Sequence, residues 1–130
     1  MCVIGSRNTG KADAERKGLR KFLNFCMMTI VQFVIGFKCS DSQCGFKIFS
    51  RNAAKRCFPT QHLERWSFDV ELLFLCNSKD VKVSEMGVKW QDVDGSHLNV
   101  VEASLSIVRD MLLIKLLYFL RVWDCNDYYY

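Results

Sequence analysis

At 130 residues the chain is long enough for one compact domain and too short for two. Half of the residues are hydrophobic and 13% are aromatic, which allows a large core and excludes a wholly disordered chain. The net charge of +4 comes entirely from residues 7 to 21, just before an apolar stretch. A basic segment in that place favours an anionic lipid surface or a phosphorylated substrate, with a solvated helix face as the alternative. It does not indicate nucleic acid, because no stacking aromatic residues alternate with the basic ones.

Two elements are predicted in the first third of the chain. Residues 1 to 6 form a short apolar strand, and residues 12 to 37 form one long helix, because apolar side chains recur at helical spacing. The apolar side of this helix consists of Leu23, Cys26, Ile30, Phe33, Val34 and Phe37. A helix that crosses a membrane needs about 20 nearly uninterrupted apolar residues, whereas this run is shorter and two-faced. We therefore expect a packed or interfacial helix rather than a spanning one.

The rest of the chain alternates short elements with a second long helix. The predicted elements are a strand at 46–49, a helix at 52–57 capped by Ser50 and ended by Pro59, a helix at 68–76, a strand at 81–90, a turn at 92–96 and a helix at 100–123. Two long apolar helices with short strands between them predict an α/β fold, and no boundary to a second domain is visible.

The seven cysteines are predicted to be reduced thiols. Their number is odd, no Cys-x-x-Cys pair occurs, and several lie in apolar segments, where free cysteine packs as a small hydrophobic residue. A zinc site needs clustered ligands, and the chain has only two histidines. The apolar run at residues 1–4 is too short for a signal peptide and lacks a basic start.

Two polar runs are the strongest functional signal in the sequence. The first is Ser40-Asp41-Ser42-Gln43-Cys44-Gly45-Phe46-Lys47, and the second is Glu64-Arg65-Trp66-Ser67-Phe68-Asp69-Val70-Glu71. Acids, bases and an amide concentrated beside apolar segments are costly to bury, so they indicate a site more often than a core.

These runs, with Gly5-Ser6-Arg7 and the stretch from Val88 to Leu98, resemble four motifs of the dolichyl-phosphate β-glucosyltransferases, which are family 2 glycosyltransferases. The motifs occur in the order and at the spacing that the family has, and the resemblance covers essentially the whole chain. It corresponds to the C-terminal, acceptor-side half of the family's domain. We therefore expect residues 1–130 to form a single incomplete domain, without the nucleotide-binding half and the membrane anchor.

The resemblance implies a fold, a reaction and a location. It implies part of a GT-A, Rossmann-like fold that transfers glucose from UDP-glucose to dolichyl phosphate with inversion, at the cytosolic face of the endoplasmic reticulum membrane. A divalent metal, Mg²⁺ or Mn²⁺, assists the intact family enzyme, but the Asp-x-Asp ligands are missing here, so we expect no metal site and no transfer by this chain alone. Two alternatives stay open: a non-catalytic, membrane-associated or partner-binding protein, and a related polyprenyl-phosphate transferase with another sugar.

The resemblance implies candidate roles for the residues of the matching motifs. Asp41 and Asp69 are the candidate catalytic carboxylates on the acceptor side, with an Asx turn and a helix N-terminal charge as their respective alternatives. The candidate substrate and phosphate contacts are Arg7, Arg20, Gln43, Lys47, Arg65 and Trp66. Arg20 has a solvated position as its alternative, and Trp66 has packing. Gly45 is expected to allow a close backbone approach, and His97 replaces a lysine of the family, which puts a phosphate contact there in doubt.

Overall fold

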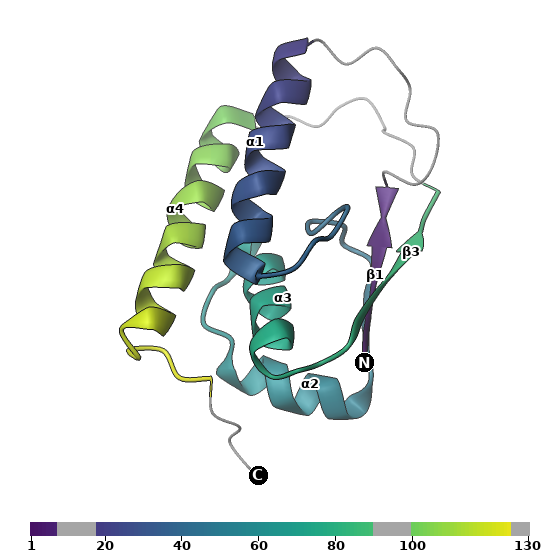
Figure 1. Ribbon diagram of the computed structural model, residues 1–130, viewed down its shortest axis with the longest axis vertical. Helices are drawn as coiled ribbons and strands as arrows, with labels where there is room; N and C mark the ends of the chain where they lie inside the picture. The colour runs from purple at the N-terminus through teal and green to yellow at the C-terminus, as the bar shows by residue number, and fades with distance from the viewer. Residues whose placement is uncertain (8–17, 90–99, 126–130) are drawn as a thin grey trace.

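The computed structural model describes residues 1–7, 18–89 and 100–125 (Figure 1). Over these residues the chain is a mixed α/β structure. The elements are β1 (Cys2–Ser6), α1 (Gly18–Ile35), β2 (Lys47–Phe49), α2 (Arg51–Cys57), α3 (Phe68–Ser78), β3 (Val83–Gly87) and α4 (Val100–Phe119), with short 3-10 helices at Phe58–Thr60 and Arg65–Ser67. The predicted α/β class, with two long helices and a few short strands, is confirmed.

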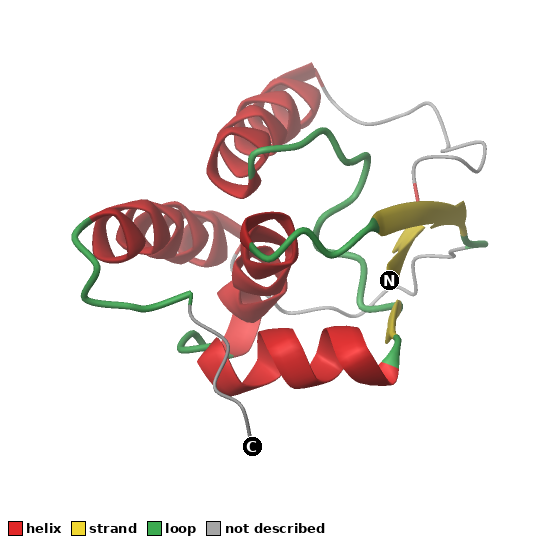
Figure 2. Cartoon of the chain, turned by 60° about the horizontal axis from the view of Figure 1, so that its bottom comes forward, coloured by secondary structure: helices red, strands yellow, loops and turns green. Residues whose placement is uncertain are grey.

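The three strands form one sheet in the order β2-β1-β3. β1 pairs antiparallel with β2 and parallel with β3. The helices lie to one side of this sheet (Figures 1 and 2). Cys2 and Ile4 are fully buried, whereas Ile48, in register with Val3 of β1, is 53% exposed. One face of the sheet therefore belongs to the core, and the other is open over the described residues.

The core lies between the sheet and the two long helices. Its centre is α3, which is apolar on nearly all sides, as expected of a helix enclosed by other elements. Helix α3 packs against α1, α2 and α4. The largest fully buried apolar side chains come from β1, α1, α3 and α4: Ile4, Val31, Val34, Ile35, Val70, Leu72, Leu73, Leu75, Met111 and Ile114.

Local sequence signals fixed several boundaries correctly. Ser50 caps α2 by accepting a hydrogen bond from the backbone N–H of Ala53, and Pro59 lies in the 3-10 helix that follows. Helix α1, in contrast, ends at Ile35, short of the predicted end at residue 37, because Gly36 follows with a φ of +82°, which suits glycine and leaves the helix. A side chain there would also collide with Asn77, because a Cβ would lie 2.6 Å from Asn77 Nδ2.

The predicted apolar side of the first helix is partly wrong. Val34 is buried as expected, but Phe33 points outward and is 74% exposed. The side that enters the core is formed by Val31, Val34 and Ile35, because α3 and α4 both pack against this helix and widen its buried stripe beyond one row. Residues 12–17 of the predicted helix, the turn at 92–96 and His97 lie outside the described residues. Among the described helices, none is long and apolar enough to cross a membrane.

All seven cysteines are free, and five of them are buried. Cys57 and Cys76 are neighbours in the core, with their sulfurs 3.8 Å apart. The prediction that the cysteines pack as small hydrophobic residues is confirmed for the buried five.

Candidate functional site

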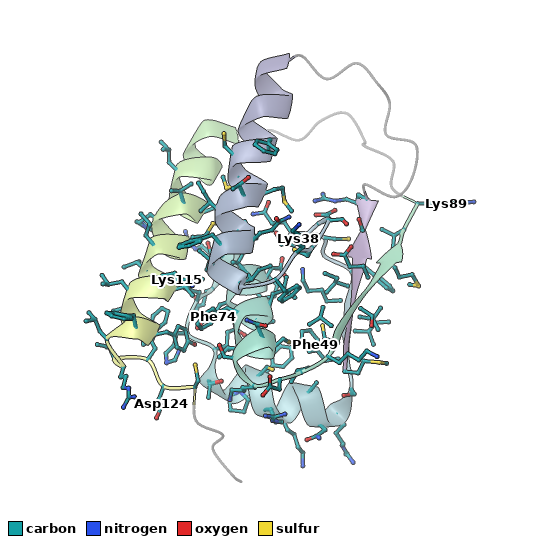
Figure 3. All side chains as sticks on the ribbon, in the orientation of Figure 1. Lys38, Phe49, Phe74, Lys89, Lys115 and Asp124 are labelled. Atoms are coloured by element: carbon teal, nitrogen blue, oxygen red, sulfur yellow. The ribbon has the colours of Figure 1, made fainter. Side chains whose placement is uncertain are left out.

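A cleft of about 940 Å³ lies where β1 and β3 end, between the loop before β2 and the start of α3. Its polar lining consists of Arg7, Gln43, Arg65, Asp69 and Lys89, and its apolar lining of Cys44, Gly45, Phe46, Phe68 and Val88. Three of the lining side chains are cations and one is a carboxylate. Figure 3 shows Lys89 extending outward from the end of β3. The cleft therefore combines a cationic rim with an apolar wall.

Asp41 stands behind this rim and holds Arg7. The Arg7 guanidinium donates two hydrogen bonds to the carboxylate, from Nε to Oδ2 at 2.5 Å and from Nη2 to Oδ1 at 2.8 Å. The backbone N–H of Arg7 donates a third to Oδ2 at 3.2 Å. Burial raises the pKa of Asp41, but these bonds more than offset it and leave the pKa below its usual value. The Asp41 carboxylate thus fixes the direction of Arg7 through paired, charge-assisted hydrogen bonds.

Asp69 is the carboxylate that faces the cleft. It follows the 3-10 helix Arg65–Ser67 in the first turn of α3 and forms an ion pair with Lys47, with 2.9 Å between Lys47 Nζ and Asp69 Oδ1. Both side chains are largely buried. Burial raises the pKa of Asp69, and the nearby Lys47 offsets this only in part. Asp69 therefore takes up a proton more readily than Asp41 does.

The loop that carries Gln43 to Phe46 is tied down at both ends. At its start, Glu85 of β3 accepts hydrogen bonds from the backbone N–H and the hydroxyl of Ser40, at 2.6 and 2.7 Å. At its end, Lys47 Nζ donates to the Cys44 carbonyl at 2.7 Å. Ser40 and Glu85, which are 45 positions apart in the sequence, thus hold one wall of the cleft in place.

Gly5, rather than Gly45, is the glycine that this site requires. A Cβ on Gly5 would lie 3.0 to 3.1 Å from Cys44, Phe46 and Val88, all of which line the cleft. A Cβ on Gly45 would meet nothing within 4 Å. Gly45 itself lines the cleft, and the close backbone approach expected at this residue stays a prediction.

The predicted site residues fall into three groups. Arg7, Gln43, Arg65 and Asp69 line the cleft. Asp41 and Lys47 lie directly behind it as the ion-pair partners of Arg7 and Asp69. Arg20 lies in the first turn of α1 and Trp66 in the 3-10 helix, and their side chains are outside what the structure describes.

Arg65 has a backbone conformation that marks it out. Its φ of +60° is in the left-handed region, which non-glycine residues seldom adopt and which is enriched at functional sites. The turn directs an exposed arginine to the cleft just before α3 begins. Among the described residues, it has no ion-pair partner, so its charge is available to a ligand.

Comparison with curated proteins gives consistent matches over nearly the whole chain. The chain is 39% identical over 128 residues to a dolichyl-phosphate β-glucosyltransferase of Dictyostelium discoideum, covering 96% of this chain and 39% of that protein. It is 37% identical over 129 residues to the corresponding enzyme of Saccharomyces cerevisiae, covering 95% of this chain and 38% of that protein. The enzyme of Mus musculus is 37% identical over 110 residues, or 85% of this chain and 34% of the mouse protein.

This chain is a relative of the dolichyl-phosphate β-glucosyltransferases. It spans less than two fifths of the length of those three proteins. No protein-family model matches the chain, and no solved structure matches it.

The described residues do not fit the divalent metal that a glucosyltransferase of this kind implies. Within residues 1–7, 18–89 and 100–125, no group of three or more His, Cys, Asp and Glu side chains is arranged to hold an ion. Asp41 and Asp69, the acids at the cleft, are each bound to a cation instead. Two cationic partners leave little negative charge for a metal to neutralise.

Several cleft residues were missed by sequence reasoning. Phe46, Phe68, Val88 and Lys89 all lie within or beside the motifs that resemble the β-glucosyltransferases, but aromatic and aliphatic residues in such motifs read as core. The signal that separates them is partial exposure, 44% for Phe46 and 37% for Phe68, and a sequence does not reveal it. Glu85 was missed because its partner Ser40 is distant in the chain.

Proposed function

We propose that this chain forms the acceptor side of a transferase that moves glucose from UDP-glucose to dolichyl phosphate with inversion. The observation that carries the proposal is the cleft, whose cations Arg7, Arg65 and Lys89 adjoin the apolar wall of Phe46, Phe68 and Val88. A polyprenyl phosphate complements this lining, because its anionic head group can bind the cations and its apolar chain can lie against the apolar wall. The relatives' names state that they act on dolichyl phosphate.

In this proposal the phosphate head binds to the guanidinium groups. Arginine suits phosphate because its planar fork makes paired, charge-assisted hydrogen bonds. Arg7 arrives already oriented by Asp41, so little conformational entropy is lost when the phosphate binds. Arg65, just before α3, brings a second cation to the cleft.

The chemical step is an in-line displacement in which a phosphate oxygen of the acceptor attacks the anomeric carbon and the nucleotide leaves. A phosphate monoester loses its second proton with a pKa of about 6, so the acceptor has at most one proton to give up. Asp69 is the cleft carboxylate with a raised pKa, and we assign to it the acceptance of a hydrogen bond or proton from that oxygen. Asp41 acts through Arg7 and is a positioning residue.

The wider setting belongs to the same proposal. The sheet and helices form the acceptor half of a GT-A domain, with residues 1–130 as one incomplete domain. Such a transferase works at the cytosolic face of the endoplasmic reticulum membrane, where the lipid acceptor resides. A divalent metal for the UDP leaving group is assigned to parts of a full-length protein outside the described residues, because the acids described here do not fit one.

Binding of a short polyprenyl phosphate, compared with the uncharged polyprenol of the same length, tests the acceptor site. The phosphate should bind at least about tenfold more tightly, because one charge-assisted hydrogen bond contributes about 1.5 to 3 kcal/mol. Arg65→Gln should lose most of that difference, and Lys55→Gln, an exposed lysine on α2, should lose none. Equal binding of the two lipids, or equal affinities of the two variants for the phosphate, would show that the cleft does not bind the phosphate head group.

A chimera tests the transfer itself. The matched segment of the yeast relative, 129 residues long, is replaced by this chain, and glucose transfer from UDP-glucose to dolichyl phosphate is measured. We expect activity, and Asp69→Asn in the chimera should lower kcat by about 100-fold, a usual contribution of acid–base catalysis. An inactive but folded chimera would contradict the proposed reaction.

A further inference from the structure

Lys47, the first residue of β2, is a lysine whose charged end lies inside the protein. Its side chain is only 6% exposed, and lysine is almost never buried unless it is paired. The ammonium forms the ion pair with Asp69 at 2.9 Å and donates a hydrogen bond to the Cys44 carbonyl at 2.7 Å. The backbone of Lys47 is held as well, because it is in register with the fully buried Ile4 of β1. Both ends of this side chain are therefore fixed.

The two partners of the Lys47 ammonium come from different walls of the cleft. Cys44 belongs to the loop of residues 43–46, and Asp69 belongs to the first turn of α3. Both line the cleft, whereas Lys47 lies behind it. An ammonium has three protons to donate, so one side chain holds the loop and the helix at the same point.

The buried pair of Lys47 and Asp69 is a costly way to stabilise a fold. Two charges lose much of their hydration on burial, and a well-packed apolar pair of similar volume is often at least as stable. The contacts of Lys47 are also directed into the protein, toward Asp69 and the Cys44 carbonyl. A pair of this kind beside a cleft is better explained by the arrangement that it imposes on the cleft than by stability.

We infer that Lys47 is a positioning residue, which orients the Asp69 carboxylate in the cleft and ties the loop of residues 43–46 to it. This role rests on the proposed function for the identity of the acceptor. It differs from the role that the sequence motif implies for Lys47, a direct contact to phosphate. In our proposal the guanidinium groups of Arg7 and Arg65 contact the phosphate, and Lys47 acts on the reaction only through Asp69 and the loop.

Lys47 also affects the charge of Asp69. Burial and the nearby Asp41 raise the pKa of Asp69, and Lys47 lowers it. The other charged residues that line the cleft are Arg7, Arg65 and Lys89. Without Lys47 the pKa of Asp69 should rise further, because burial and Asp41 then act with less to offset them. A carboxyl that is protonated at neutral pH cannot take up a proton from the acceptor, so Lys47 keeps Asp69 in its active form.

Carboxyl NMR of the full chain in mild detergent tests this effect without turnover. The Asp69 signal is identified by its loss in Asp69→Asn. Lys47→Met should raise the pKa of Asp69 by about 1 to 3 pH units, the usual effect of a neighbouring opposite charge. Lys47→Arg retains the cation and should leave the pKa close to that of the wild type. Lys55→Met, at an exposed lysine of α2, is the matched control and should change nothing.

Lipid binding separates a positioning residue from a phosphate contact. The wild-type chain and its variants are compared on a short polyprenyl phosphate and on the uncharged polyprenol. Lys47→Met should retain the preference for the phosphate, whereas Arg65→Gln should lose most of it. Hydrogen exchange of the amides in residues 43–46 should become about fivefold faster in Lys47→Met, because the loop loses one of its ties.

Kinetics of the yeast chimera give the third measurement. Lys47→Met should move the acid limb of the kcat profile to higher pH, by the same amount as the pKa of Asp69, and should change KM for dolichyl phosphate little. Lys47→Arg should restore the profile. A lysine that only stabilised the fold would lower the amount of active protein without moving the limb.

Two results would overturn the positioning role of Lys47. One is an unchanged pKa of Asp69 in folded Lys47→Met. The other is a loss of phosphate preference in Lys47→Met as large as that in Arg65→Gln, which would make Lys47 a phosphate contact. If Lys47→Met does not fold, Lys47→Gln removes the charge but keeps a donor, and the same two results decide. A wild type without phosphate preference would contradict the proposed function instead, and the pKa of Asp69 would still decide the role of Lys47.

Discussion

Asp41 and Asp69 are neighbours at one cleft, yet their pKa values are displaced in opposite directions. Burial raises both, but Asp41 receives three hydrogen bonds from Arg7, whereas Asp69 has the single cation Lys47. The larger number of donors explains why the pKa of Asp41 is lowered while that of Asp69 is raised. A difference of this kind is typical of sites where two acids have separate roles.

Substitution of Asp41 tests its contribution to the stability of the fold. Asp41→Asn should lower the free energy of unfolding at neutral pH by about 2 kcal/mol, since it weakens hydrogen bonds to a charged partner. Because the folded pKa of Asp41 is lowered, its contribution is complete above the unfolded pKa of about 4 and is lost as pH falls through the folded value. Urea unfolding should show the curves of wild type and variant converging below about pH 4. A constant gap down to pH 2 would contradict the assignment.

Glu85 is expected to hold the cleft loop through Ser40. Glu85→Gln removes the charge from two hydrogen bonds and should weaken this tether by about 1 kcal/mol, because the group is exposed to water. Hydrogen exchange of the amides from Ser40 to Gly45 should then become about fivefold faster. Glu64→Gln, at another exposed glutamate, is the control. Equal protection in both variants would show that the loop does not depend on Glu85.

At the scale of elements, a fully buried carboxylate joins α3 to the end of α4. Glu71 accepts hydrogen bonds from the backbone N–H groups of His62 and Leu63 and from the Tyr118 hydroxyl, the last at 2.8 Å. The His62 ring stacks on Trp123, with centroids 4.4 Å apart. Burial, followed by the bond to Glu71, raises the pKa of Tyr118, which keeps its proton in place as donor. The cluster fixes the loop before α3 and the chain after α4 together.

Double substitution measures the strength of this junction. Glu71→Gln should destabilise the fold by about 3 kcal/mol, because the amide cannot satisfy all three donors. Tyr118→Phe should cost about 1 kcal/mol, and the double variant should lose about 1 kcal/mol less than the sum, since the shared bond is removed once. Urea unfolding of the four proteins gives the coupling. Strict additivity would mean that Glu71 and Tyr118 act separately.

The elements were predictable from local patterns, and their partners were not. Ser50, Pro59 and the spacing of apolar residues located α2, α3 and β3 to within a few residues. Residues of the runs around Asp41 and Asp69 line one cleft, which a sequence pattern alone could only suggest. The roles of Glu71 and Glu85 depend on contacts 45 or more positions away, to Tyr118 and Ser40, which leave no periodic trace in the sequence. The direction of Phe33 likewise depended on which helices pack against α1.

At the scale of the whole molecule, two apolar surfaces lie on opposite layers. Helices α1 and α4 expose the apolar side chains of Phe33, Leu112 and Phe119 on one side of the molecule. The open face of the sheet presents Val3, Ile48 and Met86. The sheet also ends at β3, whose outer edge has no strand beside it among the described residues. An unpaired edge next to an apolar face favours strand addition between molecules.

We therefore expect the isolated chain to associate in plain buffer and to become monodisperse in mild detergent, which covers apolar surface without unfolding the core. Ile48→Lys/Met86→Lys, which places charge on the open sheet face and beside its edge, should shift most of the material from large assemblies to smaller species even without detergent. Size-exclusion chromatography with light scattering measures both effects. The helix variant Leu112→Ser/Phe119→Ser serves as comparison, because it leaves the sheet edge unchanged. A detergent-free wild-type monomer of 15.1 kDa with a cooperative melt would show that neither surface drives association.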